Sequence, residues 1–235
     1  MTRVALLAPM RQELAPLVRK LGLRRSDEDG ALHVGRTGGV EVVATTTGIG
    51  MAAAATERVL DALPIDHVMV VGIAGGVDAA QPICALIAPE LVVDGASGRE
   101  HRPAQLGEAP PRGRLLSSDA LVTGLDAAAR LLREGVVGLD METAAVAAVC
   151  ERRGCPWSVH RAISDRVTDG TTDPAILALA GPDGSGDPGA IARYLLAKPW
   201  RIVRLARLAR GSLRAADAAA DAAILACKRL GRERH

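Results

Sequence analysis

Short apolar runs of strand length alternate along this chain with segments that repeat apolar residues at helical spacing. Val4–Ala8, His67–Val71 and Trp157–Ile163 are apolar runs that predict buried strands. Residues 11–21 and the alanine-rich residues 51–62 have the periodicity of helices. Strands that alternate with helices form parallel sheets covered on both faces. The pattern therefore predicts an α/β fold with three layers, αβα, around a central mixed, mostly parallel sheet.

The other predicted elements are shorter. We expect strands at 32–34, 40–46 and 136–139 and within 83–93, a helix at 141–152, and a loop at 95–114. Glycine-rich turns are expected after two of the strands, at Gly48–Gly50 and Gly72–Gly76. Pro16 should lie near the start of its helix, because proline is poorly tolerated in a helix interior.

The end of the chain differs in composition from the rest. Residues 198–235 carry ten Lys or Arg against three Asp or Glu, whereas the remaining residues carry 19 against 24. We therefore predict a catalytic domain at 1–180, a Gly- and Pro-rich linker at 181–188 and a basic helical extension at 189–235. On a helical wheel, one side of the extension holds Arg201, Arg204, Arg207, Arg210 and Arg214, and the other holds Ile202, Leu205, Ala206, Ala209 and Leu213. Such an amphipathic helix either packs on the body or lies on anionic lipid.

The composition excludes several classes of protein. With 49% hydrophobic and 24% charged residues, the chain is globular rather than disordered. It has no apolar run of about 18 residues that would span a membrane. Its four cysteines form no CxxC pair, which indicates reduced thiols rather than a metal site. We expect a cytoplasmic protein, with peripheral membrane contact only through the basic helix, and no nucleic-acid partner, because no recognised binding motif accompanies the arginines.

Carboxylates follow several of the predicted strands. Glu13 comes after the first strand, Asp140 and Glu142 join a short strand to a helix, and Asp165 comes after the last strand. In open parallel sheets, ligands bind at the carboxyl ends of the strands. Taken singly, each residue has a structural explanation, such as a solvated helix face or a favourable helix N-terminus. Together they predict a site at one edge of the sheet.

Six short motifs occur along the chain in a set order. They are A-P-M-R-Q-E-L (8–14), T-G-I-G-M-A-A-A (47–54), V-G-I-A-G-G-V (71–77), S-S-D-A-L-V (117–122), G-L-D-M-E-T-A-A-V-A (138–147) and R-A-I-S-D (161–165). In content and order they resemble the nucleoside phosphorylase and nucleosidase superfamily, particularly the methylthioadenosine/S-adenosylhomocysteine nucleosidases. The resemblance implies cleavage of the N-glycosidic bond of a 5′-substituted adenine nucleoside. It also implies a homodimer or higher homo-oligomer that needs no cofactor, with water or inorganic phosphate as co-substrate.

The resemblance implies roles at the base end of such a substrate. Asp165 would be the general acid that protonates the leaving purine near N7. Ser164 and Arg161 would orient or support Asp165. Leu121 and Val122 would line the base pocket, with Leu121 at a position where the nucleosidases usually carry an aromatic ring.

It also implies roles at the sugar end. Glu142 would accept hydrogen bonds from the ribose hydroxyls, and Met141 would pack against the sugar. Glu13 would position the attacking water. Ile73 and Gly75, in the glycine-rich turn, would complete the binding site, although the family usually has serine at the position of Ile73.

The nucleophile stays open at this stage. Val70 lies where phosphate-binding relatives carry an arginine, which favours water, but Arg11 beside Glu13 would suit an anion. The motif V-V-D-G-A-S-G-R-E-H-R-P (92–103) and the Arg-, Leu- and Ala-rich C-terminal part resemble the hopanoid-associated phosphorylases, which implies phosphorolysis of a lipid-linked adenosine. A third alternative is a nucleoside-binding or membrane-associated relative without catalysis, which the departures at Ile73 and Leu121 and the short 95–114 segment would favour.

Overall fold

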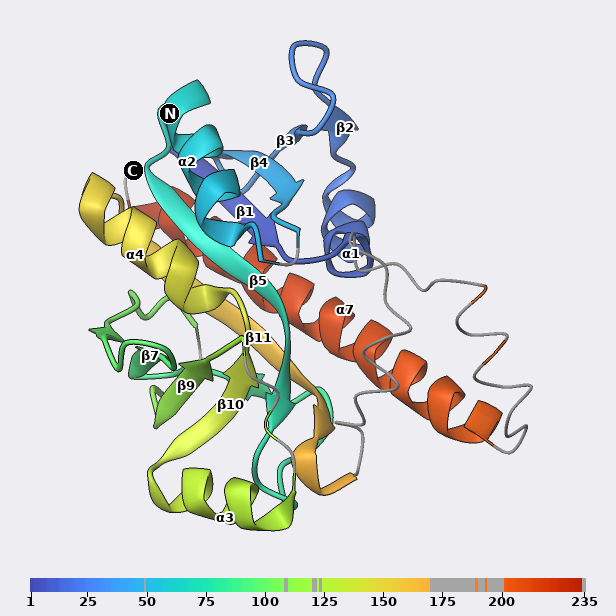
Figure 1. Ribbon diagram of the computed structural model, residues 1–235. Helices are drawn as coiled ribbons and strands as arrows, with labels where there is room; N and C mark the ends of the chain where they lie inside the picture. The colour runs from blue at the N-terminus through green and yellow to red at the C-terminus, as the bar shows by residue number, and fades with distance from the viewer. Residues whose placement is uncertain are drawn as a thin grey trace.

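The computed structural model describes residues 1–48, 50–107, 110–119, 122, 124–169, 189, 193 and 201–233. Its centre is a twisted sheet between helices (Figure 1). The strands are β1 (Arg3–Ala8), β2 (Arg24–Arg25), β3 (His33–Thr37), β4 (Val40–Thr46), β5 (His67–Gly76), β6 (Leu86–Ile87), β7 (Leu91–Asp94), β8 (Glu100–His101), β9 (Arg114–Ser117), β10 (Val136–Asp140) and β11 (Trp157–Arg166). Their order is β2-β3-β4-β1-β5-β10-β9-β7-β8, and β11 pairs with β5 and β6.

The sheet is mixed, with a parallel centre. Strand β1 pairs in parallel with β4 and β5, β5 with β11, and β9 with β10 and β7. The edge pairs β2–β3, β3–β4, β7–β8 and β6–β11 are antiparallel, and β10 meets β5 antiparallel at one residue pair. The predicted α/β fold with a mixed, mostly parallel sheet is confirmed.

Helices cover both faces of this sheet (Figure 1). They are α1 (Arg11–Leu21), α2 (Ala52–Ala62), α3 (Leu125–Arg133), α4 (Thr143–Arg153), the short 3-10 helix η1 (Val167–Asp169) and α7 (Arg201–Glu233). Helices α2 and α4 pack on one face, where Val59 and Val146 belong to the buried core. Helices α1 and α7 pack on the other, where Leu17 and Ala219 are fully buried. No helix in the described part of the chain is long and apolar enough to span a membrane.

Strands β5 and β11 run further than their apolar residues predict. Strand β5 continues through Gly72–Gly76, where a turn was expected, and β11 continues through Arg161–Arg166. The two strands pair in parallel over this length, so the backbone groups of each bond those of the other where the side chains become polar. The register shifts at Ser164, which leaves this residue as a bulge before Asp165. Bulges change the direction of neighbouring side chains and are frequent beside active sites.

Helix α7 is both a layer of the fold and a projecting arm. Its second half buries a stripe of small residues on the sheet, namely Ala215, Ala216, Ala219, Ala220, Ala223, Ala226 and Cys227. Its first half extends past the sheet (Figure 1), and Ile202, Val203 and Leu213 there are 57%, 64% and 55% exposed. The predicted linker at 181–188 lies outside the described residues, so the division into domains stays a prediction.

Three local features differ from the sequence-based expectation. Helix α3 was not expected, and β9 begins at the end of the segment predicted as a loop, which also contains β8. Pro16 lies in the second turn of α1 and is buried, rather than near the start of the helix. The apolar packing of α1 on the sheet outweighs the backbone hydrogen bond that proline cannot make.

Candidate active site

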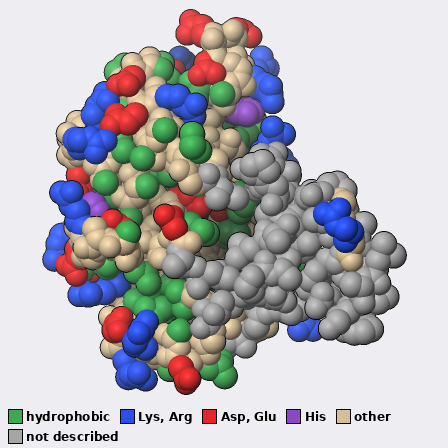
Figure 2. Space-filling model, in the orientation of Figure 1, with side chains coloured by type: hydrophobic (Ala, Val, Ile, Leu, Met, Phe, Trp, Pro, Cys, Tyr) green, Lys and Arg blue, Asp and Glu red, His purple; other side chains and the backbone are tan. Residues whose placement is uncertain are grey.

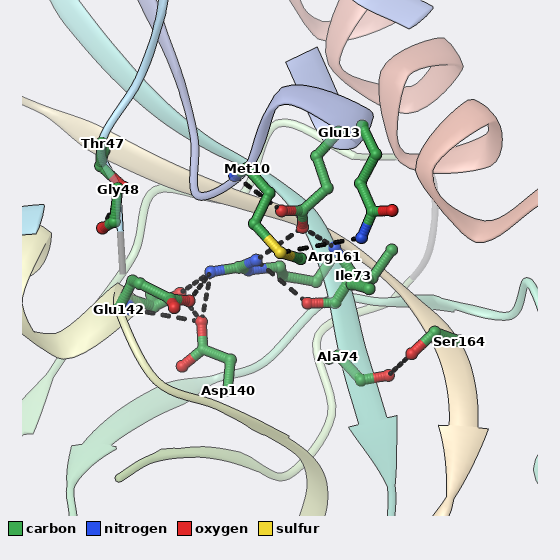
Figure 3. A network of polar contacts seen from close by, with 12 residues as sticks. Met10, Glu13, Thr47, Gly48, Ile73, Ala74, Asp140, Glu142, Arg161 and Ser164 are labelled. Atoms are coloured by element: carbon green, nitrogen blue, oxygen red, sulfur yellow. Dashed lines mark hydrogen bonds and ion pairs between the residues drawn. The ribbon is translucent and has the colours of Figure 1, made fainter. Parts of the chain in front are cut away.

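Arg161 is the buried centre of a polar network that joins β11 to three other elements (Figure 3). Its Nη2 donates to Asp140 Oδ2 at 2.5 Å and to Glu142 Oε2 at 3.3 Å. Its Nη1 donates to the carbonyl oxygen of Ile73 at 3.0 Å and lies 3.5 Å from Glu13 Oε1. The guanidinium of Arg161 is thus surrounded by the carboxylates of Glu13, Asp140 and Glu142.

Glu13 is fixed in the first turn of α1, where the helix N-terminus favours a carboxylate. Its two oxygens accept hydrogen bonds from the backbone N–H groups of Met10 at 3.0 Å and Ile73 at 2.7 Å. Burial raises the pKa of Glu13 to about 7, although Arg161 acts in the opposite direction. A Cβ at Gly72 would lie 2.2 Å from Glu13 Oε1, so only glycine leaves room for this carboxylate.

Asp140 and Glu142 occupy the short connection from β10 to α4. Asp140 Oδ2 accepts hydrogen bonds from the backbone N–H of Thr143 at 3.2 Å and from the Thr143 hydroxyl, besides its bond to Arg161. Asp140 therefore holds the first turn of α4 and the guanidinium together. Burial raises the pKa of Glu142; Arg161 opposes this effect and the charge of Asp140 adds to it.

The network carries an excess of negative charge. Three carboxylates, when ionised, surround a single guanidinium, and two of them have a raised pKa because of burial. Asp140 Oδ1 and Arg161 Nε are buried without a hydrogen-bond partner in the described part of the chain. An arrangement of this kind stabilises positive charge that develops beside it.

Asp165 lies four residues beyond Arg161 on β11, after the bulge. It is half-buried, and its Oδ1 lies 2.5 Å from the hydroxyl oxygen of Ser164. The same hydroxyl oxygen lies 3.4 Å from the carbonyl oxygen of Ala74 on β5 (Figure 3). Asp165 and Ser164 line a cavity of about 490 Å³ between the end of β11 and the first half of α7.

A family comparison identifies the group to which the fold and this network belong. The family described as the phosphorylase superfamily matches residues 3–117 and 96–183. The chain belongs to the phosphorylase superfamily. The predicted resemblance is confirmed at this level, as is the prediction of an enzyme of the nucleosidase and nucleoside phosphorylase group.

Solved structures of this superfamily share the fold at low sequence identity. A methylthioadenosine/S-adenosylhomocysteine nucleosidase of Neisseria meningitidis, in complex with methylthio-immucillin-A, is 18% identical with a TM-score of 0.72, covering 97% of this chain and 100% of that one. Futalosine hydrolase of Helicobacter pylori is 17% identical with a TM-score of 0.71, covering 96% and 97%. A mutant nucleosidase of Helicobacter pylori with 5′-methylthioadenosine in its active site is 17% identical with a TM-score of 0.70, covering both chains fully.

The superfamily fold brings some of the predicted site residues into contact and leaves others apart. Glu13, Glu142 and Arg161 share one network with the backbone of Ile73. Gly75 is the β5 partner of Asp165. Asp165 lies on the same strand as Arg161, four residues further on and beyond the bulge at Ser164.

The residues predicted to pack against the sugar and base have different surroundings. Met141 is 38% exposed beside Glu142, at the start of α4. Val122 is partly buried against the small apolar cluster that includes Leu131 and Val136, between α3 and β10. Leu121 lies outside the described residues.

Two positions in this network were not assigned a role from the sequence. Asp140 was noted beside Glu142, but its bond to Arg161 joins residues 21 positions apart, which local pattern does not reveal. Gly72 was seen only as part of a glycine-rich turn, whereas it provides the space for Glu13. Among the described residues, no group of three His, Cys, Asp or Glu side chains is arranged to hold a metal ion.

Proposed function

We propose that this protein hydrolyses the N-glycosidic bond of a 5′-substituted adenine nucleoside and releases adenine. The observation that carries the proposal is the buried network in which Arg161 holds Glu13 and Glu142, four residues before Asp165 on the same strand. Membership of the phosphorylase superfamily and the nucleosidases among the fold relatives support it.

At the sugar end, the network suits a reaction in which positive charge develops on the ribose ring. Glu142 would accept hydrogen bonds from the ribose hydroxyls, and Met141 would pack against the ring. When they are ionised, the three carboxylates around Arg161 give the site net negative charge. Because this charge is fixed and buried, it stabilises the cationic transition state without a later rearrangement of the site.

At the base end, Asp165 would give a proton to the leaving purine. The Ser164 hydroxyl has one hydrogen but lies within reach of two oxygens, Asp165 Oδ1 and the Ala74 carbonyl. The shorter contact is the hydrogen bond that Ser164 donates to Asp165 Oδ1 at 2.5 Å, whereas the hydroxyl oxygen lies 3.4 Å from the Ala74 carbonyl oxygen. Ser164 would thereby orient the Asp165 carboxyl group, whose proton would go to the base.

The surroundings of Glu13 favour water over phosphate as the nucleophile. The backbone N–H groups of Met10 and Ile73 both donate to Glu13 and are therefore not available to a phosphate oxygen. Arg161 already faces three carboxylates, so a phosphate anion beside it would meet repulsion. Glu13, in its ionised form, would accept the proton of the attacking water.

The proposal is tested by adenine release from methylthioadenosine, S-adenosylhomocysteine and a long-chain 5′-alkyl adenosine, each with and without phosphate. We expect release in phosphate-free buffer, with a free sugar as the second product. A sugar 1-phosphate, formed only when phosphate is present, would contradict hydrolysis and support the phosphorylase alternative. Tight nucleoside binding without release would support the non-catalytic alternative.

The first half of α7 supports a second proposal, peripheral contact with anionic lipid. Ile202, Val203 and Leu213 are exposed there, and residues 201–214 contain five arginines and no acidic residue. Such a helix binds at a membrane interface through apolar side chains and basic charge. We expect sedimentation with anionic but not neutral vesicles, and loss of it in the double variant Ile202→Ser/Leu213→Ser. Equal sedimentation of both proteins would contradict this contact.

A further inference from the structure

The cavity beside Asp165 has a wall of arginines. Asp165 and Ser164 line it from β11, and Arg207, Arg210 and Arg214 line it from the first half of α7. Because the three arginines are spaced by three and four residues, they lie on one face of the helix. We refer to these three residues as the arginine wall.

A close contact between backbones fixes the position of this wall. Gly211 of α7 lies against β11 so closely that a Cβ there would be 2.6 Å from the carbonyl oxygen of Ser164. All three arginines lie within about one helical turn of Gly211, and Ser164 directly precedes Asp165. The part of the helix backbone that carries the three arginines is therefore held beside the strand residue that precedes Asp165.

The charge of the arginine wall is not neutralised by its described neighbours. No carboxylate in the described part of the chain forms an ion pair with Arg207, Arg210 or Arg214, although Arg166 in the same cavity pairs with Asp169 at 2.9 Å. Three cationic side chains thus lie across the cavity from Asp165. A ligand that fills the cavity would exclude water, and the attraction between the three arginines and negative charge on that ligand would become stronger.

The two ends of the candidate site consequently have opposite charge. The carboxylates of Glu13, Asp140 and Glu142 give the surroundings of Arg161 an excess of negative charge. Asp165 lies four residues further along β11 than Arg161, which is about 13 Å along an extended strand, and the arginine wall lies on α7 in the cavity that Asp165 lines. This polarity matches the proposed reaction, in which the sugar becomes positive and the base becomes negative.

We infer that the arginine wall stabilises the negative charge that develops on the departing purine. The inference rests on the proposed hydrolysis, in which the C1′–N9 bond breaks and its electron pair moves onto the base. Asp165 gives its proton to the base at N7, the water oxygen forms the new bond to C1′, and Glu13 takes the proton that the water loses. The arginines stabilise the base while its proton is only partly transferred, as fixed donors do for other developing anions.

Substitution of the wall tests this role. We expect the double variant Arg210→Gln/Arg214→Gln to lower kcat for a 5′-substituted adenosine by about 10²-fold, since one such donor is typically worth that much. The double variant with Lys at both positions should keep most of the rate, because it keeps the charge. Arg232→Gln, an exposed position near the far end of α7, is the matched control and should have the activity of the wild type. All three wall residues are exposed, so the melting temperature should not change.

A second substrate separates charge stabilisation from a loss of structure. The leaving group of para-nitrophenyl riboside is a stable anion, so its release should depend far less on the arginine wall. An equal loss of rate for both substrates, or no loss for either, would overturn the inference. If the wild type released no base from any nucleoside, the proposed function itself would fail. Release by the wild type, with an unimpaired double variant, would overturn the role of the arginines alone.

Discussion

Arg161 is a buried cation whose removal would leave three carboxylates close together. We predict that Arg161→Met lowers the free energy of unfolding by about 3–5 kcal/mol at pH 8, the usual cost of breaking a buried ion pair. The loss should be smaller at pH 5, because Glu13, whose pKa is raised to about 7, is then largely protonated, and the raised pKa of Glu142 acts in the same direction. Urea denaturation at the two pH values measures the difference. A loss that does not depend on pH would show that repulsion among the carboxylates is not what destabilises the variant.

Glu13 should set the acid limit of activity. Its pKa is raised to about 7 by burial, and only its ionised form accepts a proton from water. We predict that kcat/KM, which reports groups of the free enzyme, falls about tenfold for each pH unit below about 7. Glu142, whose pKa is also raised, contributes to the same limb. A constant kcat/KM between pH 5 and 8 would remove Glu13 from this role.

At the scale of residues, sequence motifs located the principal candidates but not their partners. Glu13, Glu142 and Asp165 are found because each follows a strand within a family motif. The bond between Asp140 and Arg161 is formed by the fold, between β10 and β11, and no spacing along the chain encodes it. The need for glycine at position 72 likewise appears only when the carboxylate of Glu13 is in place.

At the scale of elements, the apolar runs predicted where strands begin better than where they end. Strand β11 continues beyond Ile163 because the glycine-rich end of β5 pairs in parallel with Asp165 and Arg166 on the far side of the bulge. Helix α3 has a clear amphipathic pattern, but it lies between glycines and buries only Ala128 and Leu131. A pattern that buries so little is easily read as part of a loop.

A buried chain of hydrogen bonds on β5 and β11 should make stability depend on pH. Ser158 Oγ lies 2.9 Å from His67 Nε2 and 3.1 Å from His160 Nε2. Burial lowers the pKa of His160 from 6.5 to about 3, so the unfolded chain binds a proton that the folded chain does not. This residue's contribution to stability is therefore present above pH 6.5 and is lost as the pH falls toward 3.

The variant His160→Gln isolates that contribution from other titrating groups. We predict that the variant is less stable than the wild type at pH 7, because it packs less well beside Ser158. The difference between the two should shrink by about 1.4 kcal/mol for each pH unit below 6.5. Denaturant midpoints measured from pH 7 to pH 5 provide the test, and two parallel curves would refute the assignment.

The contact of α7 with β11 should be sensitive to a single methyl group. A glycine-to-alanine change inside a helix usually stabilises it by about 0.5–1 kcal/mol. At Gly211 the added Cβ would lie 2.6 Å from the Ser164 backbone, so we predict a loss of about 1–3 kcal/mol and reduced activity beside Asp165. Gly30→Ala, where no atom lies within 4 Å, is the matched control and should be neutral. A stabilised, fully active Gly211→Ala would contradict the contact.

At the scale of the whole molecule, α7 combines a structural and a proposed functional part. Its alanine stripe closes one face of the sheet, while its first half carries the arginine wall. Composition alone predicted a basic helix but not this division. The alanines are buried because they pack on the sheet, and that contact is seen only in the folded chain. The predicted homodimer or larger oligomer stays a prediction.

Charges of both signs are interspersed on the face of the molecule that carries α2 and α4. Figure 2 shows Lys and Arg interspersed with Asp and Glu over the side that carries α2 and α4. There, Glu57 pairs with Arg152 at 2.5 Å and with Arg153 at 2.6 Å.

The central claim is that the site, negative at the sugar and proton-donating at the base, cleaves a purine nucleoside through Asp165. Its most direct test is kcat/KM for adenine release by Asp165→Asn, with Asp169→Asn from the same cavity as control. Asparagine keeps the shape of the side chain and an oxygen that accepts from Ser164 but has no acidic proton to give. We predict a loss of about 10²–10⁴-fold, the usual contribution of a general acid, and wild-type activity in the control. Full activity of Asp165→Asn would contradict the account.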